Sequence, residues 1–161
     1  MVSVLFVCLG NICRSPAAEG IFNKMLEETG LSDQVEVDSA GTSDYNLGSP
    51  ADSRMQVHAR ERGYSLSSRA RQFDRNNDYD CFDYIITMDE YNYSDVLGLA
   101  PNEKMKAKVI PMVDFCKIHD VTCVPDPYRG GDNEFRLVLD ILEDGCKQLL
   151  SYIQKRLRES R

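Results

Sequence analysis

Residues 2–19 read VSVLFVCLGNICRSPAAE and pass from an apolar run through a short loop into a helix. The run from Val4 to Val7 is too short for a helix and is typical of a strand buried on both faces of a parallel sheet. Ser15 and Pro16 are typical of an N-cap and a first helical residue, and residues 17–28 continue at helical period. Such a strand–loop–helix turn directs backbone N–H groups and the positive end of the helix dipole at one place, so it predicts an anion cradle.

Two side chains of this loop decide its expected chemistry. Arg14 offers a planar fork of donors that matches two oxygens of a phosphate, sulfate or arsenate. Cys8 is expected at the mouth of the cradle, where the positive potential of the arginine, the amides and the helix dipole favours the thiolate. A thiolate beside an oxyanion pocket indicates nucleophilic attack on phosphorus. A Cys-x5-Arg match alone is weak, since a structural cysteine near an exposed arginine is the commoner chance explanation, but its place on a strand–loop–helix turn favours catalysis.

The size and composition of the chain exclude several classes of function. Its 161 residues fit one domain, residues 1–161, with a substantial core. The net charge of −7 disfavours binding to a nucleic-acid backbone. The N-terminus enters a core strand at once, leaving no room for a targeting segment, and no apolar run reaches the roughly 20 residues of a membrane span. We therefore expect a cytoplasmic protein without membrane insertion.

The cysteines and histidines do not form a metal motif. Six cysteines without dense spacing are typical of reactive thiols in a reducing compartment rather than of a disulfide framework. Cys8 and Cys13 could begin a zinc site, but His58 and His119 lie elsewhere and neither has ligand spacing. We expect no metal and no cofactor.

Strands and helices alternate along the rest of the chain. Periodicity predicts strands over 35–39, 82–88 and 108–112, and helices over 51–62, 89–97 and 132–158. The last helix carries one apolar stripe, formed by Phe135, Val138, Leu139, Leu142, Cys146, Leu149, Leu150 and Ile153. The alternation predicts an α/β fold, a parallel sheet covered by helices on both faces. Ligands of such sheets bind beyond the carboxyl ends of the strands, where the Cys8 loop falls.

The loop residues 7–16, VCLGNICRSP, closely resemble the phosphate loop of the low-molecular-weight protein tyrosine phosphatases. Later blocks resemble that family in the same order, namely DSAGT at 38–42, ARQ at 70–72, YIITMDE at 84–90 and DPY at 126–128. The resemblance covers almost the whole chain. It implies a single three-layer domain with a central four-stranded parallel sheet, and the phosphate-binding loop after the first strand.

Attack by a thiolate expels an alkoxide or phenoxide, which needs a proton donor on the side opposite Cys8. Asp126, between Pro125 and Pro127, is the leading candidate, although Asp-Pro is also ordinary turn chemistry. The resemblance implies that Asp126 is the general acid and later the base that activates water. The expected mechanism is a two-step displacement through a cysteinyl-phosphate, in which Arg14 and the loop amides hold the phosphate oxygens.

Further residues are expected to contact the substrate or to support the loop. Those around the substrate phosphate are Leu9, Gly10, Asn11, Ile12, Cys13 and Ser15. Asn11 tolerates the left-handed backbone conformation of a tight loop and can hydrogen-bond to its neighbours. The resemblance implies that Ser15 donates a hydrogen bond to the Cys8 sulfur, as well as capping the helix, and that it shares a polar network with Asn11 and Ser39. Asp89, at the end of the third strand, is a supporting residue.

Two tyrosines match family positions that flank the substrate ring. Tyr45 lies in the loop after the second strand and Tyr128 follows the acid. Two aromatic walls would make a deep slot that suits phosphotyrosine better than the shorter phosphoserine. Taken alone, either tyrosine would be interpreted as a half-buried packing residue.

The sequence departs from its relatives at several positions. Where many relatives have a histidine before Ala-Arg-Gln, this chain has Ser68 and Arg69, so one member of the polar network is replaced or missing. Arg129 stands where many eukaryotic relatives carry a tyrosine, and it would favour acidic residues beside the phosphotyrosine. Ile12 occupies a position that is typically threonine in the protein-arginine phosphatases of the family, which favours tyrosine.

Cys13 allows two interpretations. Its sulfur could reach Cys8 and form a reversible disulfide that protects the nucleophile from over-oxidation, as similar adjacent cysteines in the family suggest. It could equally be a small buried hydrophobe on the underside of the loop.

Three functions from different classes compete. The first is a phosphatase for phosphotyrosine proteins or aryl phosphates, which would also bind free phosphate and other oxyanions as a monomer or weak dimer. The second is a thioredoxin-linked arsenate reductase, but that reaction needs two further cysteines in a mid-chain segment, where this chain has only Cys81. The third is a non-catalytic phosphotyrosine-binding protein, which would be expected to lack Cys8, Arg14 or Asp126.

Overall fold

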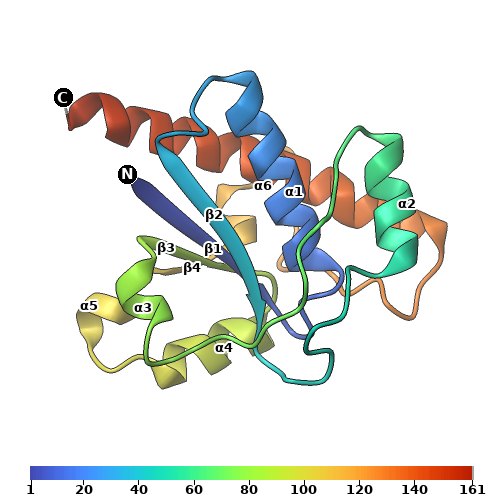
Figure 1. Ribbon diagram of the computed structural model, residues 1–161, viewed down its shortest axis with the longest axis horizontal. Coiled ribbons are helices and arrows are strands. Elements are labelled where there is room, and N and C mark those ends of the chain that lie inside the picture. Colours follow the sequence, from blue (N-terminus) through green and yellow to red (C-terminus); the bar gives the residue numbers. More distant parts are fainter. Residues whose placement is uncertain (161) are drawn as a thin grey trace.

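Four parallel strands form the centre of the computed structural model, which describes residues 1–160 (Figure 1). The first strand, β1 (Val2–Cys8), pairs with β2 (Val35–Gly41) on one side and with β3 (Tyr84–Thr87) on the other, and β4 (Val109–Pro111) pairs with β3. Because β1 lies inside the sheet, residues 4–7 are completely buried. The predicted four-stranded parallel sheet is confirmed.

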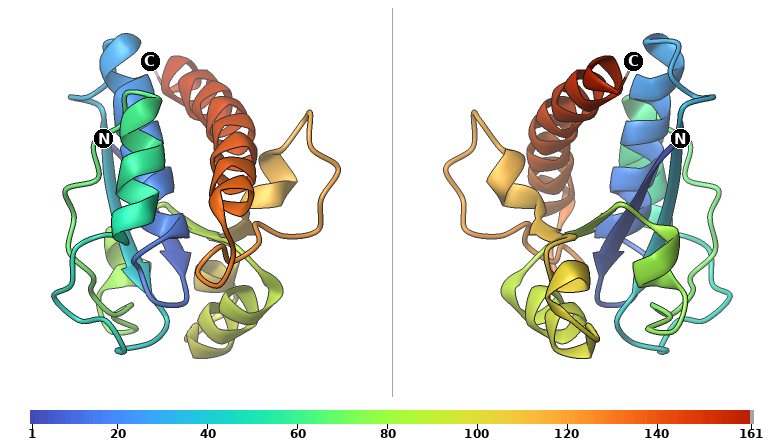
Figure 2. Two further views of the ribbon diagram at one scale, coloured as in Figure 1. Left: turned by 90° about the vertical axis from the view of Figure 1, so that its right-hand side faces the viewer. Right: turned by 90° about the vertical axis from the view of Figure 1, so that its left-hand side faces the viewer.

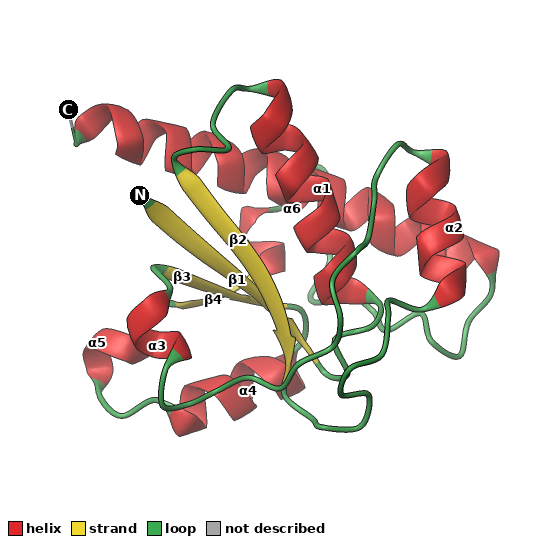
Figure 3. Cartoon of the chain, viewed as in Figure 1, coloured by secondary structure: helices red, strands yellow, loops and turns green. Residues whose placement is uncertain are grey.

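Helices cover both faces of this sheet (Figure 2). They are α1 (Arg14–Glu28), α2 (Ser53–Glu61), α3 (Asp78–Cys81), α4 (Glu90–Leu99), α5 (Glu103–Lys106) and α6 (Asp132–Glu159), with a 3-10 helix, η1, over Met112–Phe115. Side chains alternate along a strand, so Val4 and Phe6 pack in the core shared with α1 and α6. Leu5 and Val7 pack on the opposite face in the core shared with α3 and α4. The result is the predicted three-layer α/β arrangement (Figure 3).

The long helix α6 closes one side of the molecule through its apolar stripe. Every residue predicted for that stripe is buried, from Phe135 to Ile153. Within the described residues 1–160, no helix combines the length and the apolar character that a membrane crossing requires.

Asp144 of α6 anchors the segment that leads toward Asp126. Its carboxylate accepts hydrogen bonds from the backbone N–H groups of Lys117, Ile118 and His119, at 3.0, 3.0 and 2.8 Å. The ring Nδ1 of His119 lies 2.9 Å from the same carboxylate. Although burial favours the neutral acid, these hydrogen bonds lower the pKa of Asp144 to about 2.

Several predicted boundaries are wrong for local reasons. Helix α1 begins at Arg14, so Ser15 is not its N-cap, and the Ser15 hydroxyl turns inward instead. Helix α2 begins at Ser53 rather than residue 51, because the Asp52 carboxylate accepts the N–H groups of Arg54 and Met55 and caps the helix. The third strand begins two residues later than predicted.

The short helices α3, α5 and η1 were not predicted. Each has four residues, which is too short to show a helical period in the sequence.

Candidate active site

The loop between β1 and α1 is held in shape by the end of β2. The N–H groups of Thr42 and Ser43 donate to the carbonyl oxygens of Cys8 and Leu9 at 2.9 and 3.0 Å. Gly41 permits this approach, since a Cβ atom there would lie 2.7 Å from the Leu9 carbonyl oxygen. These contacts fix Cys8 at the carboxyl edge of the sheet, where the sequence predicts the anion cradle.

Asn11 supports the loop through both its backbone and its side chain. Its φ of 58° is left-handed, as expected for an asparagine in a tight turn. The amide Nδ2 donates to Ser15 Oγ at 2.8 Å and to Ser39 Oγ at 3.0 Å, and Oδ1 accepts the N–H of Arg71 at 3.0 Å. The predicted contact among Asn11, Ser15 and Ser39 is therefore present in the structure.

Ser15 connects this network to the sulfur. Its Oγ lies 3.0 Å from Cys8 Sγ, and both side chains are buried. The Ser15 hydroxyl thus connects Asn11 and Ser39 to the sulfur of Cys8.

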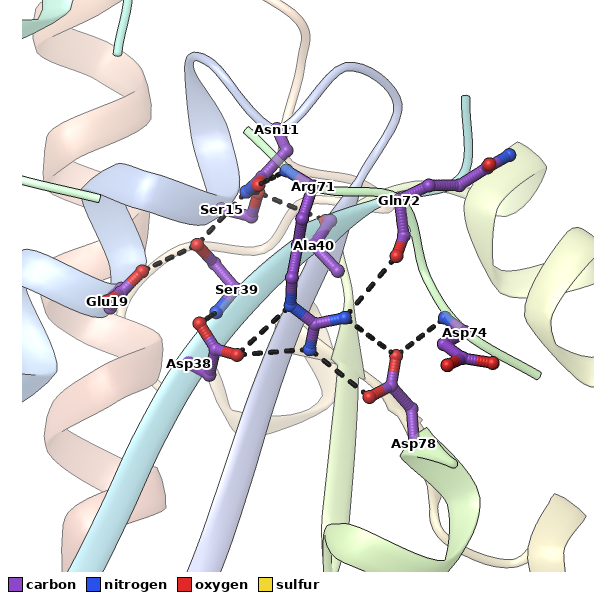
Figure 4. A network of polar contacts seen from close by, with 10 residues as sticks. All are labelled: Asn11, Ser15, Glu19, Asp38, Ser39, Ala40, Arg71, Gln72, Asp74 and Asp78. Atoms are coloured by element: carbon purple, nitrogen blue, oxygen red, sulfur yellow. Dashed lines mark hydrogen bonds and ion pairs between the residues drawn. The ribbon is translucent and has the colours of Figure 1, made fainter. Parts of the chain in front are cut away.

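The other end of the network is a carboxylate that the sequence analysis did not identify (Figure 4). Ser39 Oγ donates to Glu19 Oε1 at 2.5 Å. Burial raises the pKa of Glu19, and hydrogen bonding to Ser39 and Ser68 offsets part of that rise. Glu19 follows Ser15 by four residues and so shares its helix face, which is the signal that could have found it. Ser68 thus contacts a partly buried acid.

Arg71 belongs to the same network and connects the loop to two further carboxylates (Figure 4). Its guanidinium pairs with Asp38 at 3.0 Å and with Asp78 at 3.0 Å, while its backbone N–H holds Asn11. The arginine belongs to the Ala-Arg-Gln block on which the family resemblance rests, but the sequence alone did not suggest a role for it.

Arg14 is buried, with 2% of its side chain exposed, and is fixed by two partners. Nη1 donates to Asp89 Oδ2 at 2.6 Å and to the carbonyl oxygen of Val124 at 3.1 Å. Burial lowers the pKa of Arg14, but Cys8, Asp89 and Asp126 outweigh it and the net shift is upward. The guanidinium therefore stays charged, and Asp89 supports it while capping α4.

A pocket of about 460 Å³ opens above the loop. Its lining residues are Cys8, Leu9, Gly10, Ile12, Cys13, Arg14, Tyr45, Asn46, Asp126, Tyr128 and Arg129. Among the residues predicted to contact the substrate, Asn11 and Ser15 do not line the pocket, and both are buried. Asn46 lines it without having been predicted.

Asp126 lines the same pocket. Its Oδ2 is 3.7 Å from Arg14 Nη2, and 45% of the side chain is exposed. Its Oδ1 accepts the N–H of Tyr128 at 3.1 Å, an ordinary turn contact. Tyr45 and Tyr128 both line the pocket, and they are 79% and 51% exposed, so Tyr45 is not the half-buried packing residue that it could have been.

Cys13 lines the same pocket and is nearly buried. Burial raises the pKa of the Cys13 thiol far above its usual range, so this sulfur stays protonated. Among residues 1–160, no group of three His, Cys, Asp or Glu side chains is arranged to hold a metal ion.

The fold and the pocket define an α/β protein that can hold an oxyanion between a cysteine sulfur, an arginine and a carboxylic acid. The chain belongs to the low molecular weight phosphotyrosine protein phosphatase family, whose sequence model matches residues 3–159. It is accordingly a hydrolase of the protein tyrosine phosphatase class.

Three similar proteins illustrate the match. A protein tyrosine phosphatase from Entamoeba histolytica, crystallised with Hepes in its active site, has a TM-score of 0.93 and 45% identity over 96% of this chain and 98% of its own. The Bacillus subtilis low molecular weight protein-tyrosine-phosphatase YfkJ is 39% identical over 96% of this chain and 97% of its own. A Drosophila arginine phosphatase has a TM-score of 0.86 and 27% identity over 93% of this chain and 96% of its own.

Proposed function

We propose that this protein hydrolyses phosphotyrosine and related aryl phosphate monoesters, with Cys8 as nucleophile, Arg14 as phosphate ligand and Asp126 as general acid and base. The observation that carries this assignment is the pocket that these three side chains share, although Asp126 comes from a segment far along the chain from the loop that carries Cys8 and Arg14. Arg14 and the loop amides supply the positive charge at the phosphate, so the roles assigned here include no metal or cofactor.

In the first step, the Cys8 thiolate attacks phosphorus and the bond to the tyrosine oxygen breaks. Asp126 gives its proton to that oxygen, while Arg14 and the loop amides hold the equatorial oxygens. In the second step, Asp126 takes a proton from water, the water oxygen attacks phosphorus and the sulfur leaves. Ser15 stabilises the departing sulfur, because its hydroxyl lies 3.0 Å from Cys8 Sγ.

The walls of the pocket favour an aromatic substrate. Tyr45 and Tyr128 flank the opening, and the aromatic ring of a substrate between them would contact one tyrosine on each of its two faces. Arg129 at the rim adds a preference for acidic residues beside the phosphotyrosine. Free phosphate and other oxyanions would bind the same loop as competitive inhibitors.

The protein-arginine phosphatase activity is the closest alternative, because a Drosophila arginine phosphatase shares this fold. Ile12 lines the pocket and presents no hydroxyl to a guanidinium, which favours the tyrosine substrate. The arsenate reductase alternative needs two further thiols near the pocket, and Cys81, the only cysteine in the middle of the chain, is exposed and absent from the pocket.

The finer properties follow from the same features. All six cysteines are unpaired, which fits a reducing cytoplasm. The charge of −7 argues against nucleic acid as a partner, and we take the active form to be a monomer or weak dimer. Under peroxide, Cys8 and Cys13 would form a reversible disulfide, two thiols giving two electrons and two protons to the peroxide, which leaves as water.

The test is phosphate release from phosphotyrosine, phosphoserine and phosphoarginine substrates in EDTA. We expect release from phosphotyrosine that disappears in Cys8→Ser and falls about 100-fold or more in Asp126→Asn. Cys81→Ser, at an exposed cysteine outside the pocket, is the matched control and should keep full activity. Preference for phosphoarginine would refute the substrate assignment, and arsenate reduction without phosphate release would refute the phosphatase.

A further inference from the structure

The start of α2 is bonded directly to the phosphate loop. The N–H of Asp52 donates to the carbonyl oxygen of Ile12 at 2.8 Å. The Asp52 side chain is 9% exposed, and it accepts the backbone N–H groups of Arg54 and Met55. The first turn of α2 therefore holds a fixed position relative to the loop that carries the nucleophile.

Arg54 extends from this turn to the segment that carries Asp126. Its Nη2 donates to Asp52 Oδ2 at 3.0 Å and to the carbonyl oxygen of Tyr128 at 2.8 Å. Its guanidinium carbon lies 5.4 Å from the centre of the Tyr128 ring and 4.8 Å from that of Phe135. One planar cation thus contacts the residue two positions after the acid and the first turn of α6.

His58, one turn further along α2, fixes the other end of the same segment. Its ring stacks on Phe135 with centroids 5.8 Å apart and an interplanar angle of 12°, and Nε2 lies 3.0 Å from Asp132 Oδ1. Helix α2 and the beginning of α6 lie beside each other in the fold (Figure 1). The segment 126–132 is therefore held by two side chains of one helix.

The geometry points to Arg54 as a positioning residue that holds Asp126 and Tyr128 in register with the Cys8 loop. The inference rests on the proposed function, since it concerns the acid of that reaction. A general acid must lie within hydrogen-bond reach of the leaving oxygen. Asp126 itself is 45% exposed, and its charged contact, Arg14, is 3.7 Å away. Arg54 bonds to the carbonyl oxygen of Tyr128, and the N–H of Tyr128 donates to Asp126 Oδ1 at 3.1 Å, so Arg54 holds the residue to which the carboxyl group of Asp126 is bonded.

The role of Arg54 is tested by the dependence of kcat/KM on the leaving group. p-Nitrophenol leaves readily as an anion, whereas phenol needs the proton from the acid. We expect Arg54→Ala to lower kcat/KM about 10-fold for phenyl phosphate and by less than about 3-fold for p-nitrophenyl phosphate, because only the first reaction depends on a well-placed acid. In an Asp126→Asn background, Arg54→Ala should cause no further loss for either substrate.

Two further variants keep the test sharp. Arg54→Lys preserves the charge but not the planar stacking, so it should show the same pattern with a smaller loss. Arg60→Ala is the matched control, because Arg60 is an exposed arginine of the same helix whose side chain has no hydrogen bond or ion pair within residues 1–160. It should leave both substrates unaffected.

The position of the segment has a readout separate from activity. The chain contains no tryptophan, so Tyr128→Trp introduces a single indole beside Arg54. Adding Arg54→Ala should lower the fluorescence anisotropy of that indole, whereas Arg60→Ala should not. Unchanged anisotropy, or equal losses of kcat/KM for both substrates, would overturn the role of Arg54. An inactive wild type would instead refute the proposed function.

Discussion

The sulfur of Cys8 lies 3.0 Å from the hydroxyl oxygen of Ser15, and both side chains are buried at the base of the pocket. The hydroxyl can donate to a sulfur that becomes negative, so its largest effect should be on the step in which sulfur leaves phosphorus. A hydrogen bond to a charged group contributes about 1.5–3 kcal/mol. The Ser15 hydroxyl should therefore lower the barrier of the second step more than that of the first.

Ser15→Ala should lower kcat about 10-fold to 100-fold and lower kcat/KM less, because the missing hydroxyl would stabilise the negative charge that develops on sulfur only in the second step. Stopped-flow hydrolysis of p-nitrophenyl phosphate should then show a burst near one equivalent of p-nitrophenol. Ser151→Ala, at an exposed serine of α6, is the control. Equal losses of kcat and kcat/KM without a burst would contradict the assignment.

Arg14→Lys should weaken inhibition by inorganic phosphate and lower kcat/KM, each about 100-fold. The variant keeps one positive charge, but a lysine cannot offer two parallel donors to the phosphate while also bonding to Asp89 and the Val124 carbonyl. Inhibition constants and steady-state kinetics measure both effects. Unchanged phosphate inhibition would show that the loop amides bind the anion by themselves.

Glu19→Gln should stabilise the protein at neutral pH. The pKa of Glu19 is higher in the folded state than in the unfolded state. The protein therefore loses stability as the pH rises from the unfolded-state pKa through the folded-state pKa, and it loses none below about pH 4, where the carboxyl is protonated in both states. Glutamine can still accept the Ser39 hydroxyl. Thermal melts should show a higher Tm for the variant at pH 7 and none of that gain at pH 4. A pH-independent loss would contradict this reading of the network.

Asp144→Asn should destabilise the protein near neutral pH by about 2 kcal/mol. The folded pKa of Asp144 is about 2, below its ordinary value of 3.8, so its stabilisation is present above that ordinary value and is lost as the pH falls toward 2. The Tm difference from wild type should therefore shrink on acidification. Amide exchange at residues 117–119 should quicken in the variant, and unchanged exchange would argue against the anchor.

The sequence predicted the parts of the fold and site that depend on local pattern. Three such patterns are each contained in one short stretch of sequence: the apolar run of β1, the Cys-x5-Arg spacing and the apolar stripe of α6. The structure contains all three. Asp126 was found only because a family block flanks it, since Asp-Pro alone is turn chemistry. The structure places it at the pocket, while its role as the acid remains a prediction.

The rest depends on contacts between distant segments. From the sequence, Glu19 would be interpreted as an exposed helix residue and Arg54 as a surface charge. Only the folded structure shows that Glu19 bonds to Ser39 and that the Arg54 guanidinium lies over the rings of Tyr128 and Phe135. The N-cap assigned to Ser15 was wrong because the residue type fits a cap, whereas the tertiary contact with Cys8 decides its orientation. Such cases need the folded chain.

The bond from Arg14 to the Val124 carbonyl joins positions 110 residues apart in the sequence. Closing it requires the chain to have brought together the first strand, the third strand and the segment before α6. A refolding molecule with β1, α1 and β2 in place would already present the cysteine in its cradle, but its arginine would lack both tethers. The two bonds that fix the guanidinium span 75 and 110 positions of the chain, so we expect the phosphate site to be complete only when the whole fold has formed.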